Sequence, residues 1–425
     1  MSKYEMMTKT ELKSEFEKTY KEFEALKGKN LKLDMSRGKP GSDQLDLSEG
    51  LLTVLSKNDE CYSGKNDVRN YGMLDGIPEC KKLFAEVLGV SEKEVFVGGS
   101  ASLTLMYDVI SKAYTHGLAT SVKPWCRLDK VKFLCPAPGY DRHFRIAESF
   151  GAELITIPMT DEGPDMDMVE NEVRDPAVKG IWCVPKYSNP EGVIYSDRVI
   201  SRMASLKPAA PDFTIMWDNA YCVHEFDGDF VPFKEILTEC RNAGNPDMVY
   251  EFASTSKITF PGAGVAVIAS SERNLAYMKK LLGVQMISYD KVNQLRHARF
   301  LKDREGVLNH MKKHAAIMKP KFKVVLSYLD REIKDLDIAS WKKPEGGYFV
   351  SLDTQDGCAK RTLALAQEAG VTMTEAGATY PYGIDPRDRN IRIAPSYPPV
   401  DELKLAMEIF CVCLKLAAME KALGK

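Results

Sequence analysis

Seven short apolar runs stand out between residues 94 and 270, and several of them lead into helical patterns. One such helical pattern is "SLTLMYDVISKAY", which follows "GGSA". Strand-length runs that alternate with helices predict an α/β sheet with helices on both faces. The runs are "EVFV" before Gly98, "VKFLC" from Val131, "ELITI" from Glu153, "GIWCV" from Gly180, "FTIMW" from Phe213, "VYEFA" from Val249 and "GVAVIA" from Gly264.

The two ends of the chain have a different pattern. Within residues 8–26 the apolar side chains recur at helical spacing along one face, which predicts an amphipathic helix. Thr8 and Glu11 at its start fit a capping box. "SRGKPGSDQ" follows and is expected to be a loop. After Arg304 come a long helical stretch, "PEGGYFVSL", a helix near residues 362–369, "RNIRIAPS" and a closing helix from Asp401. We expect a large domain over 46–303 and a smaller α+β domain built from 1–45 and 304–425.

Composition excludes several classes of protein. The 425 residues are 44% hydrophobic and 28% charged, with a net charge of −2, so the sequence predicts no nucleic-acid partner. No apolar run reaches the ~20 residues of a membrane helix, and the charged start has no signal core. The ten cysteines form no CxxC pair and only six histidines are present, so we expect a cytoplasmic protein without a metal site.

Polar residues follow the apolar runs, where an α/β sheet binds its ligands. Small and hydroxyl residues after "EVFV", namely Ser100, Ala101 and Ser102, open a helix whose N-terminus suits an anion. Tyr140 lies on a Pro-Gly loop after "VKFLC" and could stack on a planar ring. Asn189 follows "GIWCV" and could donate to a ligand oxygen. Taken alone, an ordinary turn explains each of these features equally well.

Two charged residues end buried runs and are harder to explain. Asp218 closes "FTIMW" in the segment Asp218-Asn219-Ala220-Tyr221, and a buried aspartate costs free energy unless a cation partners it. Lys257 lies in "STSK" between two apolar runs, where its charged form loses water. A single ligand with a phosphate, a flat ring, a phenolic oxygen, a protonatable ring nitrogen and an aldehyde suits all of these residues. That ligand is pyridoxal 5′-phosphate (PLP).

The motifs resemble those of fold-type I PLP enzymes, the class I/II aminotransferases. "NPEG", "DNAY", "STSK" and "NIRIAPS" are similar to the family's NP-[TE]-G, D-x-x-Y, S-x-S-K and C-terminal arginine motifs, and the resemblance runs from "SRGKPG" to "NIRIAPS". It looks closest to the aspartate aminotransferase-like branch related to the effector domains of MocR-type regulators. The resemblance implies a seven-stranded, mostly parallel sheet, PLP as cofactor, and a homodimer that shares its active sites.

The resemblance also implies roles for residues around the cofactor. Lys257 would bind the cofactor aldehyde and later shuttle a proton at the substrate Cα. Asp218 would pair with the ring nitrogen, Tyr221 and Asn189 would bind the phenolic oxygen, and Tyr140 would stack on the ring. The residues implied for the phosphate are Ser100, Ala101, Ser102, Ser254 and Ser256.

Three further residues match family positions outside the cofactor ring. Tyr71, in "RNYGMLDG", matches a tyrosine that reaches the phosphate of the neighbouring subunit. Arg392 would hold the substrate α-carboxylate with a bidentate fork. Gly38, in "RGKPG", matches the glycine that closes over the substrate.

The sequence departs from the family in one respect, because "KITFPGAGVAVIAS" lacks the arginine that usually pairs with the phosphate. Lys186 is a candidate replacement, or hydroxyls and a helix N-terminus suffice. A dicarboxylic substrate needs a second cation, and Arg37, Lys291 and Arg296 are candidates, although each could equally be a solvated charge.

The leading function is amino transfer from an L-amino acid to a 2-oxo acid, with aspartate and 2-oxoglutarate favoured by resemblance. An aminotransferase with aromatic or other donors stays open. A β-eliminating lyase would use the same lysine, aspartate and tyrosine with a different substrate pose. A PLP-sensing regulator is disfavoured, because only some 35 residues precede "SRGKPG" and they hold no helix-turn-helix pattern.

Overall fold

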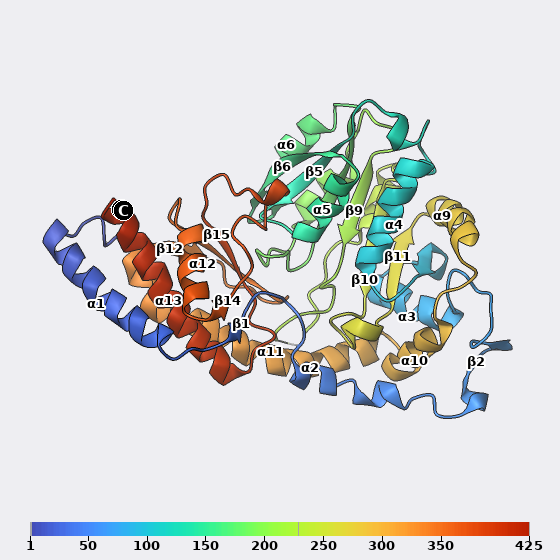
Figure 1. Ribbon diagram of the computed structural model, residues 1–425. Helices are drawn as coiled ribbons and strands as arrows, with labels where there is room; N and C mark the ends of the chain where they lie inside the picture. The colour runs from blue at the N-terminus through green and yellow to red at the C-terminus, as the bar shows by residue number, and fades with distance from the viewer. Residues whose placement is uncertain (1, 228, 425) are drawn as a thin grey trace.

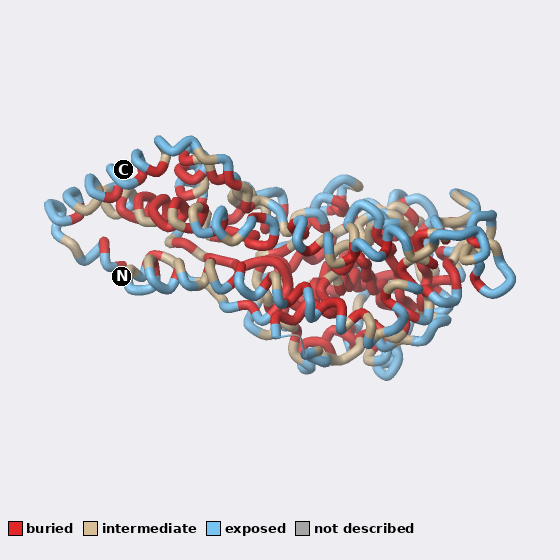
Figure 2. The backbone as a smooth tube through the Cα atoms, turned by 90° about the horizontal axis from the view of Figure 1, so that it is seen from below, coloured by how far each residue is buried: buried red, intermediate tan, exposed pale blue. Residues whose placement is uncertain are grey.

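The computed structural model describes residues 2–227 and 229–424. A large sheet lies at the centre of one body, and the N- and C-terminal helices lie together at the far end of the molecule (Figures 1 and 2). None of the helices in the described residues is long and apolar enough to cross a membrane.

The central sheet confirms all seven predicted strands. Its order is β4-β11-β10-β9-β8-β5-β6-β7, and the added strand β7 (Gly163–Pro164) is a short antiparallel partner of β6. Strands β6, β5, β8, β9 and β10 run parallel, whereas β11 is antiparallel to both of its neighbours. The seven strands are β4 (Val95–Val97), β5 (Lys132–Ala137), β6 (Glu153–Thr160), β8 (Val178–Cys183), β9 (Thr214–Asp218), β10 (Val249–Ser254) and β11 (Ala266–Ser270).

Side-chain alternation divides the core of this body between the two faces of the sheet. Ile215 and Trp217 of β9 pack on one face, and Met216 between them packs on the other. The first face is covered by α3 (Pro78–Leu88), α6 (Met166–Glu172), α7 (Asp197–Ala204), α8 (Ile236–Asn242) and α10 (Lys291–Leu301). The second is covered by α4 (Ser102–Thr115), α5 (Asp141–Ser149) and α9 (Glu272–Gln285). Helices therefore cover both faces, as predicted.

Segments from both ends of the chain share a further core. Helix α1 (Lys9–Lys27) packs on α13 (Val400–Ala422), and β1 (Leu33–Asp34) pairs in parallel with β14 (Val371–Thr372). The remaining elements here are α11 (Arg304–Glu332), β12 (Ala339–Trp341), β13 (Val350–Thr354), α12 (Ala359–Glu368) and β15 (Asn390–Ile393). Helix α11 runs from this part toward the central sheet (Figure 1). The domain boundaries at residues 46 and 303 stay a prediction.

Local sequence explains where α1 begins. The Thr8 hydroxyl accepts a hydrogen bond from the Glu11 backbone, and the Glu11 carboxylate accepts one from the Thr8 backbone at 2.9 Å. The predicted capping box is therefore present. The expected loop "SRGKPGSDQ" is wrong at its end, because α2 (Ser42–Asp46) begins inside it.

Candidate active site

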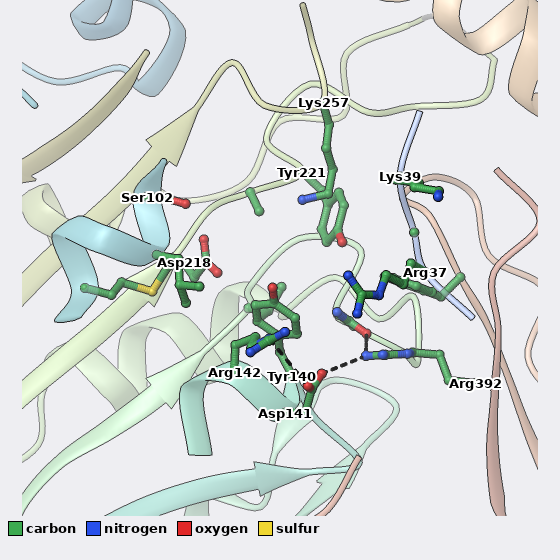
Figure 3. A pocket seen from close by; sticks show the side chains of 17 residues that line it. Arg37, Lys39, Ser102, Tyr140, Asp141, Arg142, Asp218, Tyr221, Lys257 and Arg392 are labelled. Carbon is green, nitrogen blue, oxygen red and sulfur yellow. Dashed lines mark hydrogen bonds and ion pairs between the residues drawn. The ribbon is translucent and has the colours of Figure 1, made fainter. Parts of the chain in front are cut away.

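A cavity of about 280 Å³ lies where the central strands end, facing β15. Asp218 is the last residue of β9, and Lys257 follows β10 by three residues. Figure 3 shows Lys257 entering from one side of this cavity and Arg392 from another. The predicted site residues that line it are Gly38, Ser102, Tyr140, Asn189, Asp218, Tyr221, Lys257 and Arg392.

Lys257 lies in a tight turn that presents its amine to the cavity. The carbonyl of Thr255 accepts hydrogen bonds from the backbone of Ile258 at 2.9 Å and of Thr259 at 2.8 Å. The Lys257 Nζ lies 4.9 Å from the centroid of the Tyr221 ring. Burial lowers the pKa of Lys257, and the negative Asp218 opposes that shift only in part. A lowered pKa leaves more of the amine uncharged, as a nucleophile requires.

One carboxylate oxygen of Asp218 has a hydrogen-bond partner and the other has none among the described residues. Its Oδ2 lies 2.9 Å from Nε2 of His143, whose ring stacks on Trp182 with centroids 4.6 Å apart. The other oxygen, Oδ1, is buried and has no hydrogen-bond partner among the described residues. A buried carboxylate oxygen without a partner is costly, so it suits a protonated ring nitrogen. Asp218 therefore fits the predicted cofactor.

His143 is a residue beside the site that the sequence did not predict. It lies three residues after Tyr140, on the helix α5 that Tyr140 caps. Its ring meets that of Tyr140 edge to face, with centroids 4.9 Å apart. The Tyr-x-x-His spacing was the available signal, because residues three apart share a helix face.

Two tyrosines, Tyr140 and Tyr221, line the cavity, and burial keeps their phenolic hydroxyls protonated. Burial raises the pKa of Tyr140 to about 12, with Asp218 as a smaller cause. Burial also holds the pKa of Tyr221 well above its ordinary value, with smaller contributions from the charges around it. Both phenols therefore remain hydrogen-bond donors at neutral pH.

Arg392 lies on β15 with its guanidinium held at two nitrogens. Its Nη1 donates to Asp141 at 3.3 Å and to Asn189 at 3.2 Å, and its Nη2 donates to the Thr374 hydroxyl at 3.4 Å. Its Nε is buried without a partner among the described residues. The ring of Phe349 lies 5.0 Å from the guanidinium carbon. The arginine is thus fixed in place and retains a donor for a carboxylate.

Three of the residues predicted for the phosphate, Ser100, Ala101 and Ser102, lie at the N-terminus of α4. Ser102 is the first residue of this helix and lines the cavity, whereas Ala101 is its N-cap and Ser100 is exposed. Ser254 and Ser256 lie beside each other, with their hydroxyl oxygens 3.1 Å apart. Of these residues, only Ser102 is among those that line the cavity.

Lys186 is wrong as a cation for the phosphate. Its side chain is fully buried and does not line the cavity. The Nζ forms an ion pair with Glu225, donates to the Cys222 carbonyl at 2.9 Å and lies 4.1 Å from the centroid of Phe230. The residue is therefore committed to a separate buried ion pair.

A segment from Arg37 to Lys39 borders the cavity. A side chain at position 38 would be crowded, because a Cβ on Gly38 would lie 2.4 Å from the ring of Phe349. The carbonyl of Lys39 accepts a hydrogen bond from the Ser396 hydroxyl at 2.9 Å, and its Nζ lies 3.7 Å from the centroid of Tyr397. This segment is thereby attached to the residues that follow Arg392.

The other candidate cations differ in position. Arg37 lines the cavity, together with Lys39 and Arg142. Lys291 is buried in α10, and Arg296 donates to the Leu51 carbonyl from Nε at 3.0 Å and from Nη2 at 2.9 Å. Neither of these two lines the cavity.

Tyr71 lies on the surface and does not line the cavity. Tyr71 is 79% exposed to solvent in the single chain.

Three buried histidines contact the two residues that follow Lys257 in its turn, and the sequence did not predict any of these contacts. On α11, His310 Nε2 lies 2.8 Å and His314 Nε2 lies 3.0 Å from the Ile258 carbonyl oxygen. On α10, His297 Nε2 lies 2.8 Å from the Thr259 hydroxyl. Their wide separation from Lys257 in the sequence gave no signal.

The described residues contain no group of histidine, cysteine, aspartate and glutamate side chains that could hold a metal ion. The cavity itself is lined by a lysine, a buried carboxylate, phenols and arginines. These groups fit PLP and an amino acid.

Comparison with known proteins adds independent findings. Residues 7–425 match the family model described as aspartate amino-transferase. The chain is 47% identical over 400 residues to an aspartate aminotransferase of Corynebacterium glutamicum, covering 94% of this chain and 93% of that protein. A crystal structure of an aspartate transaminase from the same species superposes with a TM-score of 0.97, at 45% identity and 99% coverage of both chains. A weaker similarity, 24% over 236 residues, links 51% of this chain to 46% of a Bacillus subtilis HTH-type transcriptional regulator, YcxD.

Proposed function

Because the chain belongs to the aspartate aminotransferase family and is an aminotransferase, we propose that it transfers the amino group of L-aspartate to 2-oxoglutarate with PLP as its cofactor. The observation that carries this proposal is one cavity lined by Lys257, Asp218 and Arg392. An amine, a ring-nitrogen partner and a carboxylate clamp are the three groups that an amino-acid transaminase needs.

The residues of the cavity suit the parts of the cofactor. Lys257 would be the amine for the aldehyde, and the free Oδ1 of Asp218 would be the acceptor for the ring N–H. Tyr221 and Asn189 would bind the phenolic oxygen, and Tyr140 would cover the ring. When bound, PLP supplies an electron sink for the substrate Cα.

The phosphate would lie at the N-terminus of α4, where Ser102 and free backbone N–H groups favour an anion. Ser100, Ala101, Ser254 and Ser256 would complete this cradle. Arg37 and Lys39 would supply positive charge to the cavity in place of the missing arginine.

The protein's own groups would then move one proton. Arg392 would bind the substrate α-carboxylate, and the Asp141 and Asn189 contacts would keep its guanidinium in place. The amine of Lys257, whose pKa burial lowers, would take the proton from the substrate Cα and return it at the cofactor carbon. Gly38 would allow the Arg37–Lys39 segment to lie close over Phe349 and exclude water.

We propose a homodimer with shared active sites, in which Tyr71 would reach the phosphate of the neighbouring subunit. The 79% exposure of Tyr71 supports this role, because a large aromatic side chain gains little by facing water. Sedimentation of wild type and Tyr71→Phe would measure the assembly, and a PLP titration of both would measure the hydroxyl's contribution.

The absorption spectrum of the protein loaded with PLP tests the function directly. We expect a band near about 420 nm that L-aspartate converts to one near about 330 nm. Conversion by aromatic or aliphatic donors alone would keep transamination and overturn aspartate as the donor. Pyruvate release without the shorter-wavelength band would favour a β-lyase. Absence of the longer-wavelength band in wild type would contradict the role of Lys257, for which Lys257→Ala is the matched control.

A further inference from the structure

Beside Arg392 and Arg37, the cavity contains a third arginine, Arg142, that the proposed reaction does not use. It lies two residues after Tyr140, in the first turn of α5, and its side chain is 47% exposed. Among the described residues, its only charged neighbour within 4.0 Å is Asp141, with Nε 3.9 Å from Oδ2. No hydrogen bond holds this guanidinium to another described residue. Arg142 is therefore a cation with a loose counter-ion.

Asp141 connects this arginine to the clamp for the α-carboxylate. Its Oδ1 accepts the 3.3 Å hydrogen bond from Arg392 Nη1, while its Oδ2 faces Arg142. Figure 3 shows the Asp141 carboxylate linked by dashed lines to both arginines. One negative charge thus lies between two positive charges at the edge of the cavity. The two contacts differ in strength, because only the contact with Arg392 is a hydrogen bond.

The other cations of the cavity are less suited to a side-chain carboxylate. Lys39 lies over the Tyr397 ring and 3.9 Å from Asp34. Lys257 is the reactive amine. Arg37 is exposed and has no ion-pair partner within 4.0 Å among the described residues, so it is the direct competitor for this role.

We propose that Asp141 and Arg142 form an exchange pair that sets side-chain specificity, an inference that rests on the proposed function. A substrate's side-chain carboxylate replaces Asp141 at Arg142, and Asp141 remains the partner of Arg142 when the side chain is neutral. The exchange conserves the number of ion pairs, so neither kind of side chain leaves a cation unpaired. Acidic substrates are favoured because their carboxylate can reach the Arg142 fork in a bidentate geometry that Asp141 lacks.

The test compares binding of succinate, which has two carboxylates, with binding of propionate, which has one. Dissociation constants are read from the absorbance change of the PLP-loaded protein, so turnover is not required. For Arg142→Gln we expect succinate to bind roughly 10- to 100-fold more weakly, as for a lost charge-assisted hydrogen bond, and propionate to change less than about twofold. For Asp141→Asn we expect the preference for succinate over propionate to rise severalfold, because the competing carboxylate is gone.

Arg37→Gln is the matched control, since it removes the other exposed arginine of the cavity. The proposal is overturned if Arg37→Gln abolishes the succinate preference and Arg142→Gln keeps it, or if Asp141→Asn lowers that preference. Retention of the long-wavelength band and of the thermal midpoint shows that each variant is folded and loaded. Failure of the proposed function looks different, because no amino acid would then convert the wild-type spectrum.

Discussion

The carboxylate of Asp218 meets the imidazole of His143 at 2.9 Å, and both side chains are buried. This contact fixes Oδ2 and leaves Oδ1 without a partner in the described part of the chain. The orientation of the free oxygen thus depends on a histidine from another element, α5.

Replacing His143 by Asn tests this dependence. We expect kcat to fall about 10- to 100-fold, the effect of losing a hydrogen bond to a charged group, while KM for the amino acid changes little. Asp218→Asn removes the charge itself and should cost more than His143→Asn. Steady-state kinetics on both variants measures the order. Equal losses would show that His143 does more than position the carboxylate.

Replacing Gly38 by Ala should weaken substrate binding. The added Cβ would lie 2.4 Å from the Phe349 ring, and that ring lies 5.0 Å from the Arg392 guanidinium carbon. Displacement of Phe349 moves the clamp, so we expect KM to rise about tenfold with a smaller change in kcat. Gly262, whose added Cβ would meet nothing within 4 Å, supplies the control Gly262→Ala. An unchanged KM for Gly38→Ala would show that the segment moves freely.

Removing Lys186 should affect stability more than catalysis. Its fully buried Nζ pairs with Glu225, and Lys186→Met would leave that carboxylate buried without a cation. We expect the free energy of unfolding in urea to fall by about 3 kcal/mol or more. The double variant Lys186→Met/Glu225→Leu should recover part of this loss. Weaker PLP binding at unchanged stability would instead restore the phosphate role that the geometry rejects.

Buried neutral histidines should make the protein less stable in mild acid. Burial lowers the pKa of His297 to about 4, from an ordinary value of 6.5. Below about pH 6.5 this histidine binds a proton in the unfolded chain but not in the folded protein. The free energy of unfolding therefore falls as the pH drops from about 6.5 toward 4. At pH 5 this histidine should cost about 2 kcal/mol.

Urea unfolding at pH 7 and pH 5 measures this cost. His297→Gln should lose about 2 kcal/mol less than wild type between the two pH values. The exposed His116 provides the control His116→Gln, which should retain the full loss. An identical pH dependence for His297→Gln and wild type would contradict the assignment.

The strands of the central sheet could be predicted from the sequence because short, strand-length apolar runs are compatible with few other structures. All seven runs are strands, and eight of the predicted site residues line one cavity because parallel strands end at the same edge. The placement of Lys186 could not be predicted in this way. Its neighbour Asn189 lies in the cavity, but a short irregular segment after β8 turns Lys186 toward Glu225, 39 residues away.

Residues that act through distant partners were also missed. His143, His310 and His314 are ordinary histidines on helices until the fold brings them to Asp218 and to the Ile258 carbonyl. Arg142 could not be singled out from the sequence, because a lone charged residue in the first turn of a helix is usually a solvated surface residue. Tyr71 remains a prediction, since a role in a neighbouring subunit cannot be read from one chain.

The attachment of Lys39 to Ser396 spans 357 positions of the chain. During synthesis at about 5 to 20 residues per second, the segment that borders the cavity leaves the ribosome about 20 to 70 s before its anchor is made. Once Lys257 has been made and until Arg392 is made, the nascent chain holds Asp218 and Lys257 but lacks Arg392. Arg392 is therefore among the last residues of the cavity to be made, and a chain that stops before it carries Lys257 and Asp218 without the arginine proposed to bind the substrate carboxylate.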